Sequence, residues 1–222
     1  MNSVVRDRVV AVERRIVAAC DRAGRRREEI TLVAVSKTFP ASAASAAIDA
    51  GILNLGENRV QEAKGKIPQV AGVARWHLIG HLQSNKVKEA VRLFDVIQTI
   101  DSIDLGERIA RAAAATGKRQ DVMVEVNIGR EPQKAGIDPD DVERVVRALN
   151  AMEALTVVGL MAIPPAGQDA EAVRPHFRRL CVLRDGVGLP GLSMGMTDDF
   201  EVAIEEGSTL IRVGRAIFGS RG

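Results

Sequence analysis

The chain has 222 residues, of which 46% are hydrophobic and 27% charged, as is typical of a soluble globular protein with one full core. A formal net charge of +2 and an aromatic content of 3% argue against nucleic acid or an anionic membrane as a partner. No apolar run is long enough to cross a bilayer, and the N-terminus lacks a signal-peptide pattern. The two cysteines have no CxxC spacing, so we expect a reduced, cytoplasmic protein without a metal site.

The hydrophobic pattern predicts one helix at the N-terminus, followed by strands that alternate with helices. Apolar residues at helical spacing predict the first helix at 4–23, which Gly24 ends. Short apolar runs predict strands at 31–35, 51–55, 75–79, 94–99, 121–127, 155–161, 191–193 and 209–213. Helical patterns between them predict helices at 41–50, 139–152, 169–185 and 198–206, with others ending near 66 and 116 or beginning after 86.

Eight strands that alternate with helices predict a parallel sheet, and eight such units close naturally into a (β/α)8 TIM barrel. The α/β fold expected here is therefore a single barrel domain over residues 1–222, with an extra N-terminal helix. An open, doubly wound sheet is the alternative, although no Gly-x-Gly-x-x-Gly motif follows the first strand. In a barrel, functional residues gather where the strands end at the C-terminal face.

A lysine stands at such a strand end. Thr31, Val33, Val35 and Lys37 have the same parity, so they point to the same face of the sheet. Partial desolvation beside buried valines favours the neutral form of an amine, which makes Lys37 a candidate nucleophile for a carbonyl. The alternative is a lysine whose ammonium group reaches out from the strand end into water.

The loops after the seventh and eighth strands are the usual place for a phosphate in a barrel. Here they contain Gly195 and Gly214, which let backbone N–H groups approach a ligand, and Ser193, which adds a hydroxyl. The pattern after Gly214 is helical, so a helix N-terminus is expected to face the anion. Asp198 and Glu201 have the spacing of a capping box and are predicted to be structural.

Arg212 shares the parity of Leu210 and is expected to point into the barrel. It either pairs with a carboxylate such as Glu125 or donates to a ring nitrogen or an anion. Pyridoxal 5'-phosphate (PLP) would use all three features, because it has an aldehyde for Lys37, a phosphate for the loops and a pyridine nitrogen for Arg212. A Schiff-base aldolase acting on a sugar phosphate would use the first two.

Six motifs in this order resemble those of the pyridoxal phosphate homeostasis protein family, the YggS/PROSC-like group related to the N-terminal barrel of alanine racemase. The resemblance runs from about the first strand to the C-terminus. The motifs are VSKT at 35–38, GENRVQE at 56–62, WHLIGHLQSNK at 76–86, GLMAIP at 159–164, LSMGMTDD at 192–199 and RVGRAIFG at 212–219.

The resemblance implies a PLP-binding barrel of the alanine racemase class (fold type III) that lacks the racemase β domain. Lys37 matches the Schiff-base lysine of the family. Arg212 matches the arginine that faces the pyridine nitrogen, and Asn58 and Met161 match positions that line the ring. His81 varies between histidine and proline in the family and is given no chemical role.

The phosphate-binding positions implied by the resemblance are Ser193, Gly214 and Arg215, with Arg215 contributing its backbone N–H. The family often has threonine at position 215, where the hydroxyl can also reach the phosphate. The Arg215 side chain of this sequence either contacts the phosphate by charge or points to solvent.

The expected activity follows from two observations. An arginine beside the pyridine nitrogen disfavours its protonation, so the ring is a weak electron sink and transamination is not expected. Racemisation needs a second acid/base group, which alanine racemase takes from a tyrosine in its β domain, whereas we expect no second domain here and the sequence has no tyrosine. We therefore expect a monomeric, non-catalytic protein of PLP homeostasis that holds PLP as a Schiff base on Lys37 and hands it to PLP-requiring apo-enzymes. A racemase-like PLP enzyme that uses Lys37 with His81 or a bound water is the alternative.

Overall fold

Eight parallel strands form a closed barrel in the computed structural model, which describes residues 2–220 of the chain. Each strand pairs with its neighbours in sequence, and β1 pairs with β8 to close the ring. The strands are β1 Thr31–Val35, β2 Asn54–Glu57, β3 Arg75–Leu78, β4 Val96–Ile100, β5 Gln120–Glu125, β6 Leu155–Met161, β7 Gly191–Ser193 and β8 Leu210–Val213. This arrangement confirms the predicted (β/α)8 barrel.

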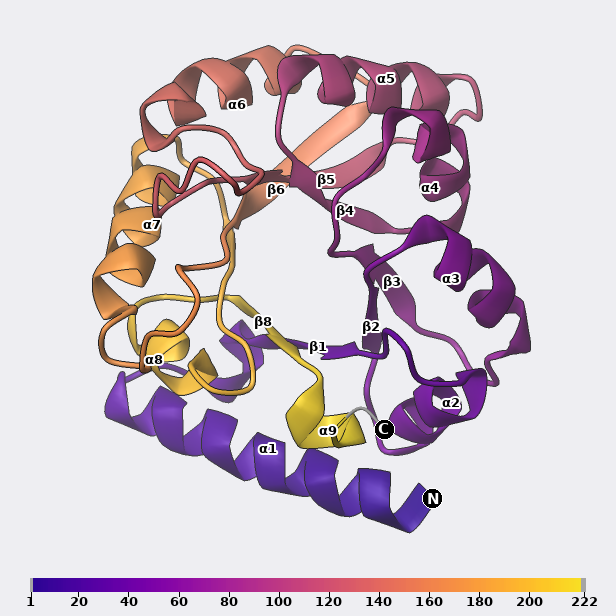
Figure 1. Cartoon of the computed structure of the whole chain (residues 1–222), viewed down its shortest axis with the longest axis vertical. Helices are drawn as coiled ribbons and strands as arrows, with labels where there is room; N and C mark the ends of the chain where they lie inside the picture. The colour runs from indigo at the N-terminus through magenta and orange to yellow at the C-terminus, as the bar shows by residue number, and fades with distance from the viewer. Residues whose placement is uncertain (1, 221–222) are drawn as a thin grey trace.

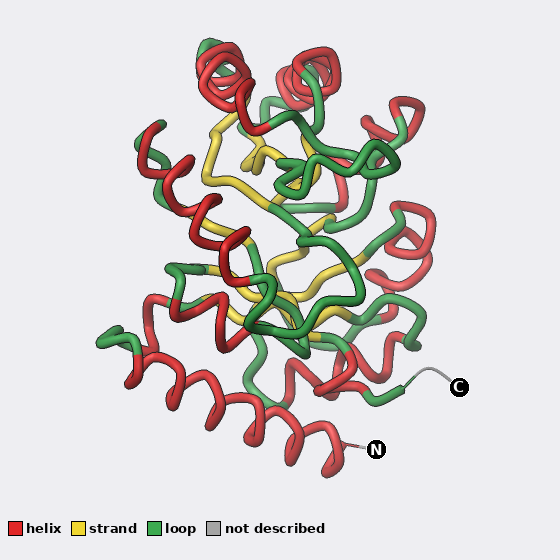
Figure 2. Tube along the Cα trace, turned by 60° about the vertical axis from the view of Figure 1, so that its left-hand side comes forward, coloured by secondary structure: helices red, strands yellow, loops and turns green. Residues whose placement is uncertain are grey.

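Helices surround the barrel on its outer side, as Figures 1 and 2 show. They are α1 Asn2–Arg22, α2 Ala41–Asp49, α3 Val60–Lys66, α4 Val87–Leu93, α5 Ile103–Ala114, α6 Val142–Asn150, α7 Arg174–Gly186, α8 Phe200–Glu205 and α9 Arg215–Phe218. Among the residues that the structure describes, no helix combines the length and apolar character needed to span a membrane.

Successive side chains of β1 point alternately to the outer side of the barrel, where the helices pack, and to the barrel interior. Leu32 and Ala34 belong to the large core between barrel and helices. Thr31 and Val35 line cavities at opposite ends of the barrel interior. Lys37 lies two residues beyond Val35, and it lines the same cavity as Val35. Lys37 thus lies on the side that its parity predicted, although β1 ends at Val35 and Lys37 itself stands in the turn that follows.

The N-terminal helix α1 packs against α2, α8 and α9 (Figure 1). Its buried face carries the apolar residues Val5, Val9, Val12 and Ile16. Since α9 has only four residues, α1 covers the part of the outer layer beside β8 and β1 that a longer last helix would cover. The predicted extra helix is thus an integral part of the wall.

The predicted second strand, at 51–55, is wrong at both ends. Gly51 has φ +94° and donates to Ile48 O, while Ile52 donates to Ala47 O, so these residues form a Schellman cap after α2. The strand starts only at Asn54 and continues to Glu57. The shift places the Glu57 side chain in the strand that leads into the site.

Candidate functional site

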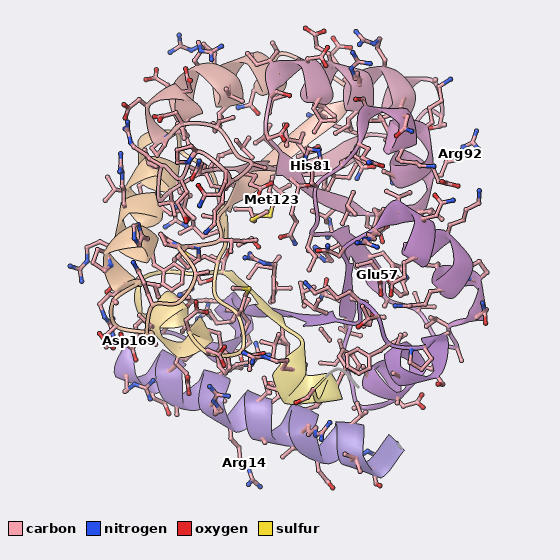
Figure 3. All side chains as sticks on the ribbon, viewed as in Figure 1. Arg14, Glu57, His81, Arg92, Met123 and Asp169 are labelled. Atoms are coloured by element: carbon pink, nitrogen blue, oxygen red, sulfur yellow. The ribbon has the colours of Figure 1, made fainter. Side chains whose placement is uncertain are left out.

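A cavity of about 580 Å³ opens at the C-terminal end of the barrel, a volume within the usual range of small-molecule sites. The ends of β1, β2, β3, β6, β7 and β8 all contribute to it. Its lining residues are Val35, Lys37, Phe39, Asn58, Ile79, Ile163, Met196, Thr197, Asp198, Arg212, Gly214, Arg215, Gly219 and Ser220. In Figure 3, Met123 of β5 lies inside the ring of strands, whereas Arg14 and Arg92 point outward from the helices.

Two loops that carry cavity residues meet through aromatic rings. Phe39 follows Lys37 in the loop after β1, and its ring lies 5.3 Å from the ring of Phe218 in α9. Gly214 begins the turn into α9, and a Cβ at this position would stand 3.3 Å from Val35 O. The lysine-bearing loop and the glycine turn after β8 are therefore neighbours on one side of the cavity.

A second close approach holds Asn58. A Cβ on Gly80 would lie 2.2 Å from Asn58 O and 2.7 Å from Asn58 Cγ, far inside contact distance. Only glycine allows the turn after β3 to pass this close to the turn after β2. Gly80 thereby fixes the position of Asn58 at the cavity wall.

The guanidinium of Arg212 begins a chain of hydrogen bonds through the barrel interior. Arg212 Nη1 donates to Ser193 Oγ at 2.5 Å, and Ser193 donates its single hydroxyl proton to Gln98 Oε1 at 2.6 Å. Gln98 Nε2 donates to Nδ1 of His77 at 2.9 Å, so His77 carries its proton on Nε2 and donates to Asn54 Oδ1 at 3.1 Å. Because arginine can only donate, every bond in the chain points from Arg212 towards Asn54.

Arg212 and His77 are the two titratable groups in this series of hydrogen bonds, and burial lowers the pKa of both. Burial lowers the pKa of His77 to about 3, so its imidazole is neutral, as the hydrogen-bond directions require. Burial also lowers the pKa of Arg212 to about 10, although the negative charges of Asp199 and Glu125 oppose the shift. Arg212 therefore keeps its positive charge at neutral pH.

The Arg212 side chain is held by neutral partners. Besides Ser193, it donates from Nη2 to Ala162 O at 3.0 Å. The alternative that Arg212 forms an ion pair with Glu125 is wrong, because in the described part of the chain Arg212 donates to Ser193 and Ala162, and Glu125 acts on it only through its charge. Burial raises the pKa of Glu125, whose Oε2 is buried without a hydrogen-bond partner.

Comparison with known proteins supplies the family. The family model described as "Alanine racemase, N-terminal domain" matches residues 11–222. The pyridoxal phosphate homeostasis protein of Aquifex aeolicus is 40% identical over 222 residues, covering 97% of this chain and 97% of that protein. The Escherichia coli K12 protein of the same name is 41% identical over 232 residues, covering 100% and 98%. The chain belongs to the pyridoxal phosphate homeostasis protein family.

Solved structures agree with this family assignment. The structure of PipY from Synechococcus elongatus with PLP bound has a TM-score of 0.86 and 33% identity, and the match covers 97% of this chain and 100% of that chain. An alanine racemase of Clostridium difficile has a TM-score of 0.74 at 14% identity. This second match covers 57% of the racemase chain and indicates a shared barrel fold.

Five of the seven residues predicted for the family's cofactor site line the cavity, namely Lys37, Asn58, Arg212, Gly214 and Arg215. The other two, Met161 and Ser193, are fully buried in the barrel interior. Met161 packs with Val96 and Met123, and the hydroxyl proton of Ser193 is directed to Gln98. A phosphate contact by Ser193 and a ring contact by Met161 stay predictions.

The side chain of Arg215 lies at the rim. It is 62% exposed and forms an ion pair with Asp198, which also lines the cavity. The predicted capping box of Asp198 and Glu201 is wrong, because α8 begins directly after Asp199 and Glu201 pairs with Arg15 of α1 at 2.8 Å. Arg15 also donates to Thr197 O at 3.3 Å, and this bond connects α1 to the loop after β7.

Sequence reasoning missed two groups of residues in this site. Thr197 lines the cavity in the same loop as Gly195, and its Oγ1 accepts a bond from Ala216 N at 3.4 Å. Gln98 and His77 complete the interior chain behind Arg212. The long polar side chain of Gln98 in the middle of the strand β4, Val-Ile-Gln-Thr-Ile, was an available signal for an inward-facing partner.

Proposed function

We propose that this protein binds PLP in the cavity at the barrel mouth, holds it as a Schiff base on Lys37, and serves PLP homeostasis without catalytic turnover. The observation that carries the proposal is that one cavity brings together Lys37, the charged guanidinium of Arg212 and the glycine turn of Gly214. The PLP-bound relative at 33% identity supports the same assignment.

The residues of the cavity fit this cofactor. Lys37 provides the amine, and Gly214 leaves open the space that a Cβ would take beside Val35 O. Arg212 is a donor-only cation that two neutral partners hold in place. When bound, PLP supplies an aldehyde for the amine and a ring that can accept electrons. The phosphate would lie at Gly214, with Ser193 and the Arg215 backbone N–H as further predicted ligands, and Asn58 and Met161 would line the ring.

Arg212 argues against amino-acid turnover. Its positive charge persists at neutral pH, and a neighbouring positive charge disfavours protonation of a pyridine nitrogen. An unprotonated ring withdraws electrons less strongly from a substrate. The residues that line the cavity thus suit retention of PLP better than transamination.

Racemisation requires a second acid/base group opposite Lys37. Among the described residues that line the cavity, Asp198 carries the only carboxylate, and it is exposed and paired with Arg215. His81 is 60% exposed and lies 3.4 Å from Asp101. A racemase-like PLP enzyme would use Asp198, His81 or a bound water as the second group, and this is the second candidate function.

The test is the visible spectrum of the purified protein before and after borohydride reduction, with peptide mapping. The expected result is a yellow protein that bleaches and carries a reduced pyridoxyl group on Lys37, and no such adduct in Lys37→Ala. Lys134→Ala is the matched lysine control. A protein that stays colourless and unlabelled after incubation with PLP would refute the proposal.

Turnover is tested separately by α-proton exchange of amino acids in heavy water. No exchange is expected. Exchange that disappears in both Lys37→Ala and Asp198→Asn would favour the racemase-like enzyme. We further propose that residues 1–222 act as one PLP-binding domain, monomeric and cytoplasmic, which hands PLP to apo-enzymes.

A further inference from the structure

A buried ionic cluster lies outside the cavity lining, beside residues 36–40, the loop after β1 that carries Lys37 and is called the lysine loop below. Lys66 of α3 donates to Glu57 Oε1 at 2.7 Å and to Glu62 Oε1 at 2.9 Å. The side chain of Lys66 is 6% exposed, and that of Glu57, shown in Figure 3 between β2 and α3, is fully buried. Buried charges are costly, and in some proteins a buried ionic cluster is retained because it fixes one conformation.

The ammonium of Lys66 has no donor to spare. Its third bond runs to Ser36 O at 2.7 Å, which completes the three donors that an ammonium possesses. Lys66 therefore acts on the chain around it, and it is unavailable as a second amine for an aldehyde. The three bonds connect β2 and α3 with the end of β1.

The cluster contacts both neighbours of Lys37 in the chain. On one side, Ser36 donates from Oγ to Glu57 Oε1 at 2.6 Å, and the backbone carbonyl of Ser36 accepts the bond from Lys66. On the other side, the backbone N–H of Thr38 donates to Glu62 Oε1 at 2.5 Å.

Thr38 has φ +68°, a conformation that is rare and unfavourable for a β-branched residue. Such a conformation persists where the surroundings enforce it, often at a functional site. The bond from Thr38 N–H to Glu62 supplies a contact that enforces it here.

We propose that Glu57, Glu62 and Lys66 form a positioning unit, which fixes the backbone on each side of Lys37 so that its amine is presented to an aldehyde in the cavity. The inference rests on the proposed function, because it assigns the unit to Schiff-base formation with PLP. The unit forms hydrogen bonds with residues 36 and 38, while the side chain of Lys37 lines the cavity. Its effect is therefore on formation of the covalent bond and not on the non-covalent fit of PLP.

Glu62 is the residue to change. Its side chain is 27% exposed, so its loss leaves no fully buried unpaired charge, whereas Lys66→Met would strand Glu57. Glu62→Gln keeps an acceptor for Thr38 N–H and removes the charge. Glu89→Ala is the matched control. Glu89 of α4 forms an ion pair with Lys64, which lies in α3 like Glu62, and this pair does not involve the lysine loop.

The experiment mixes apo-protein with PLP and follows the imine absorbance by stopped flow, with borohydride trapping on Lys37. Glu62→Ala is expected to slow imine formation about tenfold, the effect of losing one hydrogen bond to a charged group. Glu62→Gln is expected to restore most of the rate, and Glu89→Ala to behave as wild type. In a Lys37→Ala background, Glu62→Ala should leave the non-covalent Kd for PLP unchanged.

Each other outcome overturns the inference. An unchanged rate in Glu62→Ala, or equal slowing in Glu89→Ala, removes the unit's link to Lys37. Equal slowing in Glu62→Gln removes the hydrogen-bond basis. A weaker Kd in the Lys37→Ala background assigns Glu62 to the cavity as a whole. A wild-type protein that forms no imine overturns the proposed function itself, and is recognised before any variant is measured.

Discussion

The buried imidazole of His77 predicts a specific loss of stability in acid. Burial lowers its pKa from 6.5 to about 3 in the folded protein, while the unfolded chain keeps a value near 6.5. Between these two values the unfolded state binds one more proton than the folded state, so stability falls as the pH falls. The contribution is fully present above pH 6.5 and is lost progressively towards pH 3.

The size of the effect follows from the shift. Each pH unit between the two pKa values costs about 1.4 kcal/mol, which amounts to about 2.6 kcal/mol between pH 7.5 and pH 4.5. Other titrating groups also contribute to the pH dependence of the wild type. The quantity to measure is therefore the difference in free energy of unfolding between wild type and His77→Gln, which removes only this proton.

Urea unfolding of both proteins at pH 7.5, 6.5, 5.5 and 4.5 provides the test. The stability advantage of the wild type over His77→Gln should shrink by about 2.6 kcal/mol across this range. His176→Gln, which changes a histidine outside the barrel interior, is the matched control. A constant difference between wild type and His77→Gln would mean that His77 takes up a proton in the folded state, and the hydrogen-bond directions derived for the interior chain would then be wrong.

Three further substitutions have expected outcomes. Gln98→Leu leaves the Ser193 hydroxyl without an acceptor in the core and should lower the free energy of unfolding by about 1–3 kcal/mol, measured by urea unfolding, whereas an unchanged midpoint would contradict the chain. Gly80→Ala should displace Asn58 and weaken PLP binding in a fluorescence titration, and wild-type affinity would show that the close approach is not needed. Phe177→Ala should destabilise the protein by about 3–5 kcal/mol because the ring is 1% exposed, and a loss below 1 kcal/mol would contradict its place in the core.

The fold was predictable because strand periodicity and the βα alternation are local patterns. The apolar runs at β1, β6 and β7 gave the bounds that the structure has. The start of β2 was predicted too early because Ile52, although buried and apolar, is not part of the strand. It belongs to the cap that ends α2, and an apolar residue after a cap glycine resembles the start of a strand.

The site was predictable only as far as strand ends determine it. Lys37, Gly214 and Arg212 follow from parity and from the barrel rule that functional groups gather at the C-terminal face. Arg212 bonds to Ser193 of β7 and to Ala162 just after β6, and Ser193 in turn bonds to Gln98 of β4. Nothing in a single sequence tells which inward residues of distant strands touch. The cluster of Lys66 was missed for the same reason, since an exposed-looking lysine in a charged helix gives no sign of burial.

The contact of α1 with α8 and α9 has a consequence for how the chain acquires its structure. Helix α1 also packs against α2, but α8 and α9 lie far along the chain, so the part of its apolar face that they cover stays open until they have been made. Contacts of such large sequence separation are slow to form. The turn after β8, which carries Arg212 and Gly214, is part of this late assembly. The cavity at the barrel mouth should therefore be complete only after β8 and the turn that follows it have folded.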